Sequence, residues 1–264
     1  MLSNNNPRVK YLHRLGSRRF REREGMFLVE GVRFVEEAFA SSFHLEMLAY
    51  SGKAMENDRC LDLLEDAAVR GVPCFEVEQR LFNELAETVT PQGIVAVARR
   101  RWERLIDIKK TAGSWLLVVA DGIQDPGNLG TIVRSADAAG ADGVILLEGT
   151  ADIFNPKTLR ATMGSVFHIP IIQDVTFPEI REFLRAEGIK LIAAVPRKGQ
   201  AVYDCSMTGD CAILTGGEAA GPQSETLLAA AEYVHIPMPG QAESLNVAVS
   251  AGILLFEAVR QRRG

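Results

Sequence analysis

The chain has 264 residues, of which 47% are hydrophobic and 24% charged, and its formal net charge is −5, as is typical of a globular protein with one large domain or two ordinary ones. No apolar run reaches the roughly 18 residues that a membrane-spanning helix needs, and the N-terminal sequence MLSNNNPRVKYLHRLG lacks the continuous apolar segment of a secretory signal. These features argue against a membrane-spanning or secreted protein and predict a cytoplasmic one.

Residues 1–24 are predicted to form one or two basic amphipathic helices, because Val9, Leu12 and Leu15 recur at helical spacing. Through residue 23 the segment has seven basic residues and one acidic residue, and aromatic residues lie among them. Phosphate binding depends on a local basic surface more than on the net charge of the whole chain. Either the segment is a solvated helix face, or it contacts RNA through Arg8, Lys10, Arg18, Arg19, Arg21 and Arg23.

From residue 26 the sequence alternates between short apolar segments and helical patterns, which predicts a compact α/β unit. The expected strands are residues 26–29, 45–50, 74–77 and 94–98. Helices are expected after Gly31 and at residues 59–70 and 79–88. Residues 99–113 are charged and begin with three consecutive arginines, so we place the domain linker there. This predicts an N-terminal domain of residues 1–105 and a C-terminal domain of residues 106–264.

The C-terminal domain is predicted to be an α/β domain with a parallel sheet covered by helices on both faces, because nearly continuous apolar strands alternate with helical patterns. The expected strands are residues 115–120, 144–147, 166–169, 190–194, 212–215 and 233–237. The expected helices are residues 129–139, 156–163, 177–186, 224–231 and 245–262.

The first of three unusual loops follows the strand at 115–120. A Pro/Gly turn carries Asn128, and Arg134 is expected on the second turn of the next helix. Because the two residues are six apart, we expect their side chains to point to roughly the same side. The carboxyl ends of strands in an open α/β sheet are where ligands bind. The plainer alternative is an Asn that caps a helix and an Arg on the surface.

The second and third loops also follow predicted strands. Residues 214–222 are rich in glycine and have Glu218 at their centre, but they match neither the dinucleotide nor the triphosphate fingerprint. In residues 236–250, Ser244 is well placed to cap the last helix, with Asn246 in its first turn. The four cysteines form no CxxC pair and have no histidine at ligand spacing, so free thiols and no metal site are expected at Cys60, Cys74, Cys205 and Cys211.

In this order the three loops closely resemble the SpoU (TrmH-like) family of SPOUT RNA methyltransferases. The matching motifs are Asn128-x-Gly130-x-x-x-Arg134, Gly216-x-Glu218-x-x-Gly221, and Ile236-Pro237-Met238 with Ser244-Leu245-Asn246-Val247-Ala248. The N-terminal domain resembles an L30e-like substrate-binding domain in its basic start, its Phe27-Leu28-Val29-Glu30-Gly31 and its Thr90-Pro91-Gln92-Gly93. The resemblance implies a deep C-terminal trefoil knot, which pattern reading does not show and which folds generally avoid.

The resemblance further implies S-adenosylmethionine as cofactor, a homodimer, and methyl transfer to a ribose 2′-hydroxyl of RNA without a metal. It makes Arg134 catalytic, together with Asn128, Glu218, Ser244 and Asn246. The cofactor residues that it implies are Thr215, Gly216, Gly217, Gly221, Ile236, Met238, Leu245 and Ala248. The family pattern often has Ser where this chain has Gly217, Gly where it has Ala219, and an aliphatic residue where it has Pro222.

Several readings of substrate and mechanism stay open. We expect ribosomal (23S) RNA because of the N-terminal domain, with tRNA as the alternative and an antibiotic-resistance rRNA methylase as a narrower variant. A non-catalytic RNA-binding module is the alternative of another class, whereas a dehydrogenase would need a glycine fingerprint that the chain lacks. A guanidinium has a pKa above about 12 and is a poor base, so Arg134 is expected to orient phosphate. Glu218 or a phosphate oxygen would then accept the proton.

Overall fold

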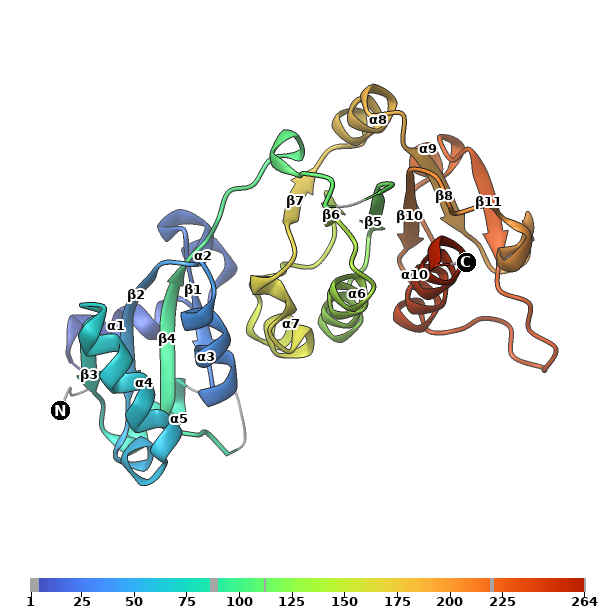
Figure 1. Cartoon of the computed structure of the whole chain (residues 1–264). Helices are drawn as coiled ribbons and strands as arrows, with labels where there is room; N and C mark the ends of the chain where they lie inside the picture. Colours follow the sequence, from blue (N-terminus) through green and yellow to red (C-terminus); the bar gives the residue numbers. More distant parts are fainter. Residues whose placement is uncertain (1–4, 86–89, 112, 219–220, 264) are drawn as a thin grey trace. The chain divides into compact units, whose positions relative to one another are not determined.

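The computed structural model describes residues 5–85, 90–111, 113–218 and 221–263. The chain divides into two compact units (Figure 1). One contains Met1–Arg101 with Phe154–Leu159, and the other contains Trp102–Ile153 with Arg160–Gly264. The sequence predicts a division after residue 105 and gives no sign that residues 154–159 belong with the first unit.

The first unit is a four-stranded sheet, in the order β1-β4-β2-β3, with helices packed on it. Strand β4 is antiparallel to β1 and β2, whereas β2 and β3 are parallel. The elements are α1 (Pro7–Arg14), α2 (Arg18–Glu24), β1 (Met26–Glu30), α3 (Val32–Ala40), β2 (Leu45–Tyr50), η1 (Gly52–Glu56), α4 (Asp58–Val69), β3 (Cys74–Glu76), α5 (Gln79–Leu85) and β4 (Ile94–Arg99). All four predicted strands are present, and the end of the helix predicted at 79–88 lies outside the described residues.

The basic N-terminal segment folds as two short helices because local signals start and stop each of them. Asn6 accepts a hydrogen bond from the Arg8 amide and Pro7 occupies the first helical position, so α1 begins there. Gly25, at φ 66°, ends α2 in the left-handed conformation that glycine favours. The apolar side chains Val9, Leu12 and Leu15 join the core of this unit, as their spacing predicts.

The second unit is built on a seven-stranded sheet in the order β7-β6-β5-β10-β8-β11-β9, in which every neighbouring pair is parallel. From residue 102 onward the elements are η2 (Leu105–Asp107), β5 (Leu116–Asp121), α6 (Pro126–Ala138), β6 (Gly143–Leu147), α7 (Pro156–Thr162), η3 (Ser165–Phe167), β7 (Ile171–Val175), α8 (Phe177–Ala186), β8 (Lys190–Ala194), β9 (Gln200–Ala201), η4 (Val202–Asp204), β10 (Cys211–Gly216), α9 (Ser224–Leu228), β11 (Glu232–His235) and α10 (Val247–Arg263).

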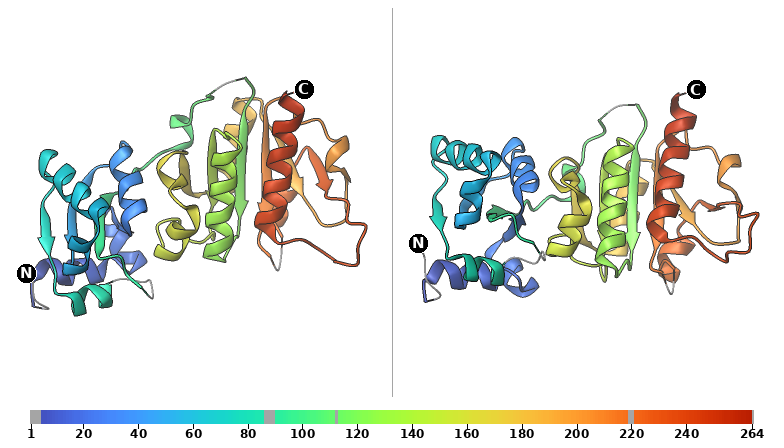
Figure 2. Two further views of the ribbon diagram at one scale, coloured as in Figure 1. Left: turned by 60° about the horizontal axis from the view of Figure 1, so that its bottom comes forward. Right: turned by 90° about the horizontal axis from the view of Figure 1, so that it is seen from below.

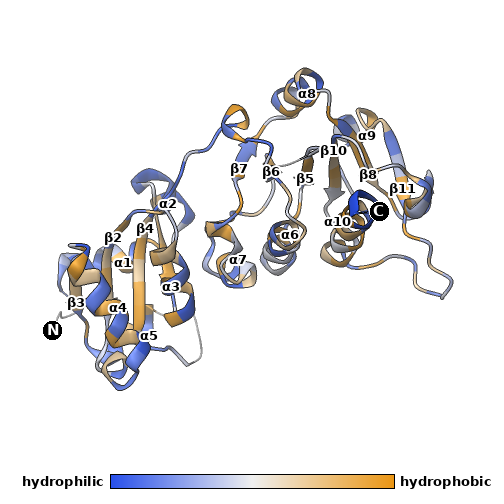
Figure 3. Ribbon diagram, viewed as in Figure 1, coloured by the Kyte–Doolittle hydropathy of each residue, from blue (hydrophilic) through white to orange (hydrophobic). Residues whose placement is uncertain are grey.

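Helices cover both faces of the large sheet, as the continuous apolar strands predict. On one face, alternate residues such as Leu117 and Leu214 pack against Ile180 and Leu184 of α8. On the other face, α6 and α10 lie side by side over β5 and β10 (Figure 2). Hydropathy follows this arrangement, because β5 and β10 are largely hydrophobic whereas α8 carries hydrophilic stretches (Figure 3). The position of α10 matters for function because its first turn reaches the carboxyl edge of the sheet.

One strand prediction is wrong. Residues 166–169 are not a strand, because residues Ser165–Phe167 form a single 3₁₀ turn and β7 begins only at Ile171. Gly164, at φ 102°, starts the turn, and its carbonyl accepts a hydrogen bond from the Phe167 amide. Buried apolar residues look alike in a tight turn and a short strand, so periodicity could not separate the two. The two-residue strand β9 is too short to leave a pattern, and α9 ends at Leu228, before the predicted residue 231.

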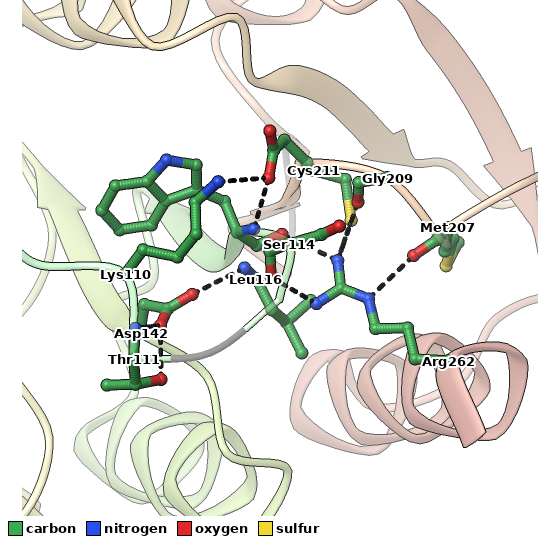
Figure 4. Close-up of polar contacts among 11 residues, drawn as sticks. Lys110, Thr111, Ser114, Leu116, Asp142, Met207, Gly209, Cys211 and Arg262 are labelled. Atoms are coloured by element: carbon green, nitrogen blue, oxygen red, sulfur yellow. Dashed lines mark hydrogen bonds and ion pairs between the residues drawn. The ribbon is translucent and has the colours of Figure 1, made fainter.

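The amino edge of the sheet is closed by the last helix. Arg262 donates from its guanidinium to the carbonyl oxygens of Ser114, Trp115, Met207 and Gly209, at 2.7–3.0 Å (Figure 4). Nearby, Asp210 accepts from the Trp115 amide and from Lys110. These bonds attach the C-terminal end of α10 to the segments that enter β5 and β10.

Candidate functional site

A pocket of about 550 Å³ lies where β8, β10 and β11 end and α10 begins. Because these strands are parallel, their carboxyl ends share one edge of the sheet, where α/β proteins bind ligands. The predicted cofactor residues that line it are Thr215, Gly216, Gly217, Gly221, Ile236, Met238 and Leu245. Ala248 does not line it, because its side chain is buried in the packing of α10.

Residues 194–196, at the end of β8, also line the pocket, and they are not among the predicted site residues. They are Ala194, Val195 and Pro196, so no polar residue marks them in the sequence. Their place in the site depends on β8 pairing with β10, which brings the two strand ends together. Sheet order is a long-range property, and periodicity along the chain does not reveal it.

The pocket contains a buried hydroxyl that is available to a ligand. Thr215 is 1% exposed, and its Oγ1 has no hydrogen-bond partner among the described residues. Buried polar atoms are nearly always paired, so an unpaired one in a pocket wall indicates a missing partner. The Thr215 hydroxyl can donate to or accept from a bound molecule.

The glycines of the pocket loop allow chain segments to approach too closely for any side chain. A Cβ on Gly216 would lie 1.9 Å from the Pro222 nitrogen, and a Cβ on Gly217 would lie 2.5 Å from the Gly122 carbonyl oxygen. A serine at position 217, which the family pattern often has, would therefore clash with this backbone. The departure at Gly217 therefore fits the close approach of Gly122, and Pro222 lies against Gly216, where no side chain has room. Ala219 and Ala220 lie outside the described residues.

Three polar side chains from distant parts of the sequence form one hydrogen-bonded cluster at the pocket. Asn246 Nδ2 donates to Asn128 Oδ1 at 2.9 Å, and Asn128 Nδ2 donates to Glu218 Oε1 at 2.6 Å. Asn246 and Glu218 also line the pocket. The structure thus brings together three of the five predicted catalytic residues.

Asn246 is the residue that caps α10. Its Oδ1 accepts from the amides of Ala248 and Val249, at 2.9 and 3.3 Å. The prediction that Ser244 is the cap is wrong, because the helix begins at Val247, which is three residues further on. Ser244 is exposed and lines the pocket instead.

Arg134 stands apart from the cluster. Helix α6 begins at Pro126, with Asp125 as its cap, so Asn128 lies inside the first turn and Arg134 on the third. Six helical residues turn through about 600°, which leaves the two side chains about 120° apart around the axis. The expectation that they point to the same side is therefore wrong. Arg134 is exposed and makes no hydrogen bond or ion pair with any residue that the structure describes.

The basic N-terminal helices present part of the predicted RNA-contacting set. Arg21 must be removed from it, because it is 2% exposed and donates to the carbonyl oxygens of Leu15 and Gly16, at 2.9 and 2.7 Å. Its role is to hold the turn between α1 and α2. The others are exposed, namely Arg8, Lys10, Arg18, Arg19 and Arg23.

Other site classes find little support in the described ranges. They contain no group of three or more His, Cys, Asp or Glu side chains that could hold a metal ion. The four cysteines are free, and Cys60, Cys205 and Cys211 are buried. Within the same ranges, no helix has the length and apolar character required to cross a membrane.

Comparison with known proteins matches both units. Residues 115–256 match the SpoU rRNA Methylase family, and residues 6–96 match the MRM3-like substrate binding domain. The chain is 37% identical over 252 residues, 95% of each chain, to the 23S rRNA (guanosine(2553)-2′-O)-methyltransferase RlmP of Bacillus subtilis (strain 168). It is 36% identical over 214 residues, 79% of this chain and 86% of the other, to RlmB of Xylella fastidiosa (strain Temecula1 / ATCC 700964), a 23S rRNA (guanosine-2′-O-)-methyltransferase.

Solved structures agree with these matches. The AdoMet-bound rRNA methyltransferase from Sinorhizobium meliloti superposes with a TM-score of 0.88 at 34% identity, covering 98% of this chain and 97% of that one. The SpoU methyltransferase AviRb from Streptomyces viridochromogenes, in complex with AdoMet, gives a TM-score of 0.89 at 33% identity, covering 98% and 99%.

Proposed function

Because this chain belongs to the SpoU rRNA methylase family, we propose that it transfers a methyl group from S-adenosylmethionine to a ribose 2′-hydroxyl of 23S rRNA. The observation that carries the proposal is the hydrogen-bonded cluster of Asn128, Glu218 and Asn246 at a pocket of ligand size. The cluster joins three segments that are far apart in the sequence. A similar chain, matched over 95% of its length, is named for this reaction on 23S rRNA.

The pocket residues fit the cofactor. Thr215 supplies a buried hydroxyl, and the glycines at 216 and 217 let the backbone approach a ligand closely. Ile236, Met238 and Leu245 supply apolar wall, which suits an adenine ring. When bound, S-adenosylmethionine supplies an electrophilic methyl group on a sulfonium that leaves as a neutral thioether. Ser244, exposed at the same pocket, is the fifth member of the proposed catalytic set.

A ribose 2′-hydroxyl is a weak nucleophile until it loses its proton, so the site needs an acceptor. We assign Glu218 to this role, because Asn128 holds one of its carboxylate oxygens while the side chain is exposed at the pocket. Asn246 and Asn128 are positioning residues in this scheme. Arg134, whose guanidinium is too basic to accept the proton, binds RNA phosphate beside the hydroxyl.

A homodimer completes the proposed site. Val249 and Phe256 are each 51% exposed and lie seven residues apart, so they share one face of α10. Such a face favours burial against another protein surface, and we infer that a second copy of this chain covers it. Arg134 is on α6, which packs against α10, and it points away from Asn128 of its own subunit. In the dimer, Arg134 of one subunit would serve the cluster of the other.

The exposed basic residues of the N-terminal helices are assigned to substrate binding. The exposed residues Arg8, Lys10, Arg18, Arg19 and Arg23 bind rRNA phosphates in the cytoplasm. Residues 194–196, 215–218, 221–222 and 236–247 contribute lining residues to one pocket. From the resemblance to the family we propose that the C-terminal segment follows a knotted path. The proposed domain boundary stays at residues 105 and 106, within the linker.

The test is to incubate the protein with methyl-labelled S-adenosylmethionine and 23S rRNA, 16S rRNA or bulk tRNA, each as naked RNA and 23S rRNA also as assembled subunits. Label in 23S rRNA alone is the expected result. Label in tRNA alone would replace the proposal with the tRNA alternative. RNA binding without cofactor binding or transfer would identify a non-catalytic module.

A further inference from the structure

A buried carboxylate lies directly beneath the pocket loop. Asp121 ends β5 and is 0% exposed. Its Oδ2 accepts from the backbone amide of Gln223 at 2.8 Å, and its Oδ1 accepts from Gln223 Nε2 at 2.9 Å. Among the described residues these are the hydrogen bonds of the carboxylate, and both come from Gln223. A buried carboxylate is costly unless it is paired in this way.

The backbone of Asp121 holds the other end of the same loop. Gly216 is opposite Asp121 in the pairing of β10 with β5, and the Gly217 amide donates to the Asp121 carbonyl at 2.9 Å. Gly217 in turn accepts from the Gly221 amide at 2.8 Å. Asp121 therefore binds the residue where the loop leaves β10 and, through its carboxylate, the residue where the loop ends before α9.

Neither Asp121 nor Gln223 lines the pocket, but the loop between β10 and α9, whose two ends they hold, does. That loop supplies Gly216, Gly217, Gly221 and Pro222 to the pocket wall, together with the side chain of Glu218. Helix capping does not explain the bonds, because Gln223 is itself the N-cap of α9 and its amide precedes the helix. The contacts join a strand end to a loop end, so their consequence is the shape of the loop.

We propose that Asp121 and Gln223 are positioning residues. Their two hydrogen bonds, which we call the clasp, hold together the two ends of the loop between β10 and α9. The clasp thereby sets the shape of the pocket wall and the position of Glu218. The identity of the ligand that the loop binds rests on the proposed function, whereas the closing of the loop does not. Because Gln223 is exposed apart from the atoms that contact Asp121, it can be altered with little disturbance of the core.

Two substitutions separate the clasp from a general effect of charge. Gln223→Glu places a second carboxylate against Asp121 and removes the side-chain donor. Asp121→Asn removes the charge but can keep both bonds, because Gln223 can turn its amide so that its oxygen accepts from the new amide. Glu225→Gln is the matched control, since Glu225 is an exposed residue two positions further on.

The experiment measures the Kd of S-adenosylmethionine by calorimetry, kcat with saturating RNA, and amide hydrogen exchange of Gly217 and Gly221. For Gln223→Glu we expect a Kd raised about tenfold, a lower kcat and faster exchange at both amides, which is the scale of a lost charge-assisted hydrogen bond. Asp121→Asn should stay within about threefold of the parent Kd on the same scale, and Glu225→Gln should equal the parent.

Unchanged exchange and Kd in Gln223→Glu would overturn the clasp, and so would an Asp121→Asn variant as impaired as Gln223→Glu. Hydrogen exchange needs no cofactor, so it distinguishes the two proposals. A parent protein that binds no S-adenosylmethionine refutes the proposed function, whereas the exchange rates still decide whether the clasp closes the loop.

Discussion

Asn246 Nδ2 donates a hydrogen bond to Asn128 Oδ1 at 2.9 Å, and this bond sets the direction of the whole polar cluster. The Asn246 oxygen is occupied by the first amides of α10, so its nitrogen must face Asn128. Asn128 therefore presents its own nitrogen to Glu218. The orientation of the helix cap Asn246 thus determines that Asn128 donates a hydrogen bond to Glu218. An ionised carboxylate can only accept hydrogen bonds, so this orientation is the one it requires.

Substitution at Asn246 can separate helix capping from catalysis. Asp caps helices as well as Asn does, so Asn246→Asp should keep the stability of the protein. It has no amide to donate, so Asn128 would turn and present its oxygen to Glu218, and we expect kcat to fall by about a hundredfold, the scale of one lost donor in an active site.

The companion variant is Asn246→Ala, which removes the cap as well. It should lose about as much activity as Asn246→Asp, and its unfolding free energy should also fall by about 1 kcal/mol. Denaturant unfolding and single-turnover methyl transfer measure the two effects. A fully active Asn246→Asp would show that the direction of the cluster is irrelevant to catalysis.

Arg134 offers a test of function without a confounding loss of structure. It is exposed and makes no hydrogen bond or ion pair with a described residue, so Arg134→Lys should leave the Tm and the Kd of S-adenosylmethionine unchanged. A lysine cannot present the planar, bidentate fork of a guanidinium to a phosphate. We therefore expect kcat/KM for RNA to fall by about a hundredfold, a loss of about 2.7 kcal/mol.

The matched control is Arg185→Lys, at an exposed position on α8, a helix on the opposite face of the sheet. It should retain the activity of the parent. If Arg134→Lys behaves like this control, Arg134 has no role in binding phosphate.

Arg262 is expected to stabilise the fold and not to act in the reaction. Its guanidinium donates to four backbone carbonyl oxygens at the amino edge of the sheet (Figure 4). Hydrogen bonds from a charged group contribute more than neutral ones, so Arg262→Ala should lower the unfolding free energy by about 3 kcal/mol. Arg263→Ala, at an exposed neighbouring position, should change it by less than about 0.5 kcal/mol. Equal stability of the two variants would contradict the anchoring role.

The face of α10 that carries Val249 and Phe256 predicts a dimer. Sedimentation equilibrium of the parent protein should give twice the mass of one chain. Phe256→Glu places a charge in the buried interface, so it should give monomers and abolish methyl transfer, while leaving the circular dichroism spectrum unchanged. A monomeric parent, or an active monomeric variant, would contradict a site shared between subunits.

The sequence predicts elements well where the signals are local. The helix at 177–186 has the predicted bounds because Thr176 and Glu179 form a capping box at its start. The strand at 190–194 also matches, since Gly188 lies two residues before it and Pro196 two residues after it. Local signals fail where two candidates compete, as with Ser244 and Asn246, because only the path of the chain decides which side chain reaches the helix amides.

Long-range features of the site were not predictable from one sequence. The resemblance to a family brought Asn128, Glu218 and Asn246 together, but it gave no hydrogen bonds between them. Arg21 belongs to a run of basic residues, and nothing in that run marks it as the one that folds inward. No local pattern marks Asp121 as a positioning residue, because its partner, Gln223, lies about a hundred residues away in the sequence.

The most direct measurement determines where on the RNA the methyl group is placed. A 2′-O-methylated ribose lacks the hydroxyl that attacks the adjacent phosphodiester in alkali, so the bond after it survives alkaline hydrolysis. After labelling of 23S rRNA with S-adenosylmethionine, alkali should release the label in dinucleotides. Glu218→Gln, which keeps the bond from Asn128 but cannot take the proton, should strongly reduce the label. Label in mononucleotides, which indicates a methylated base, or no transfer at all would contradict the account.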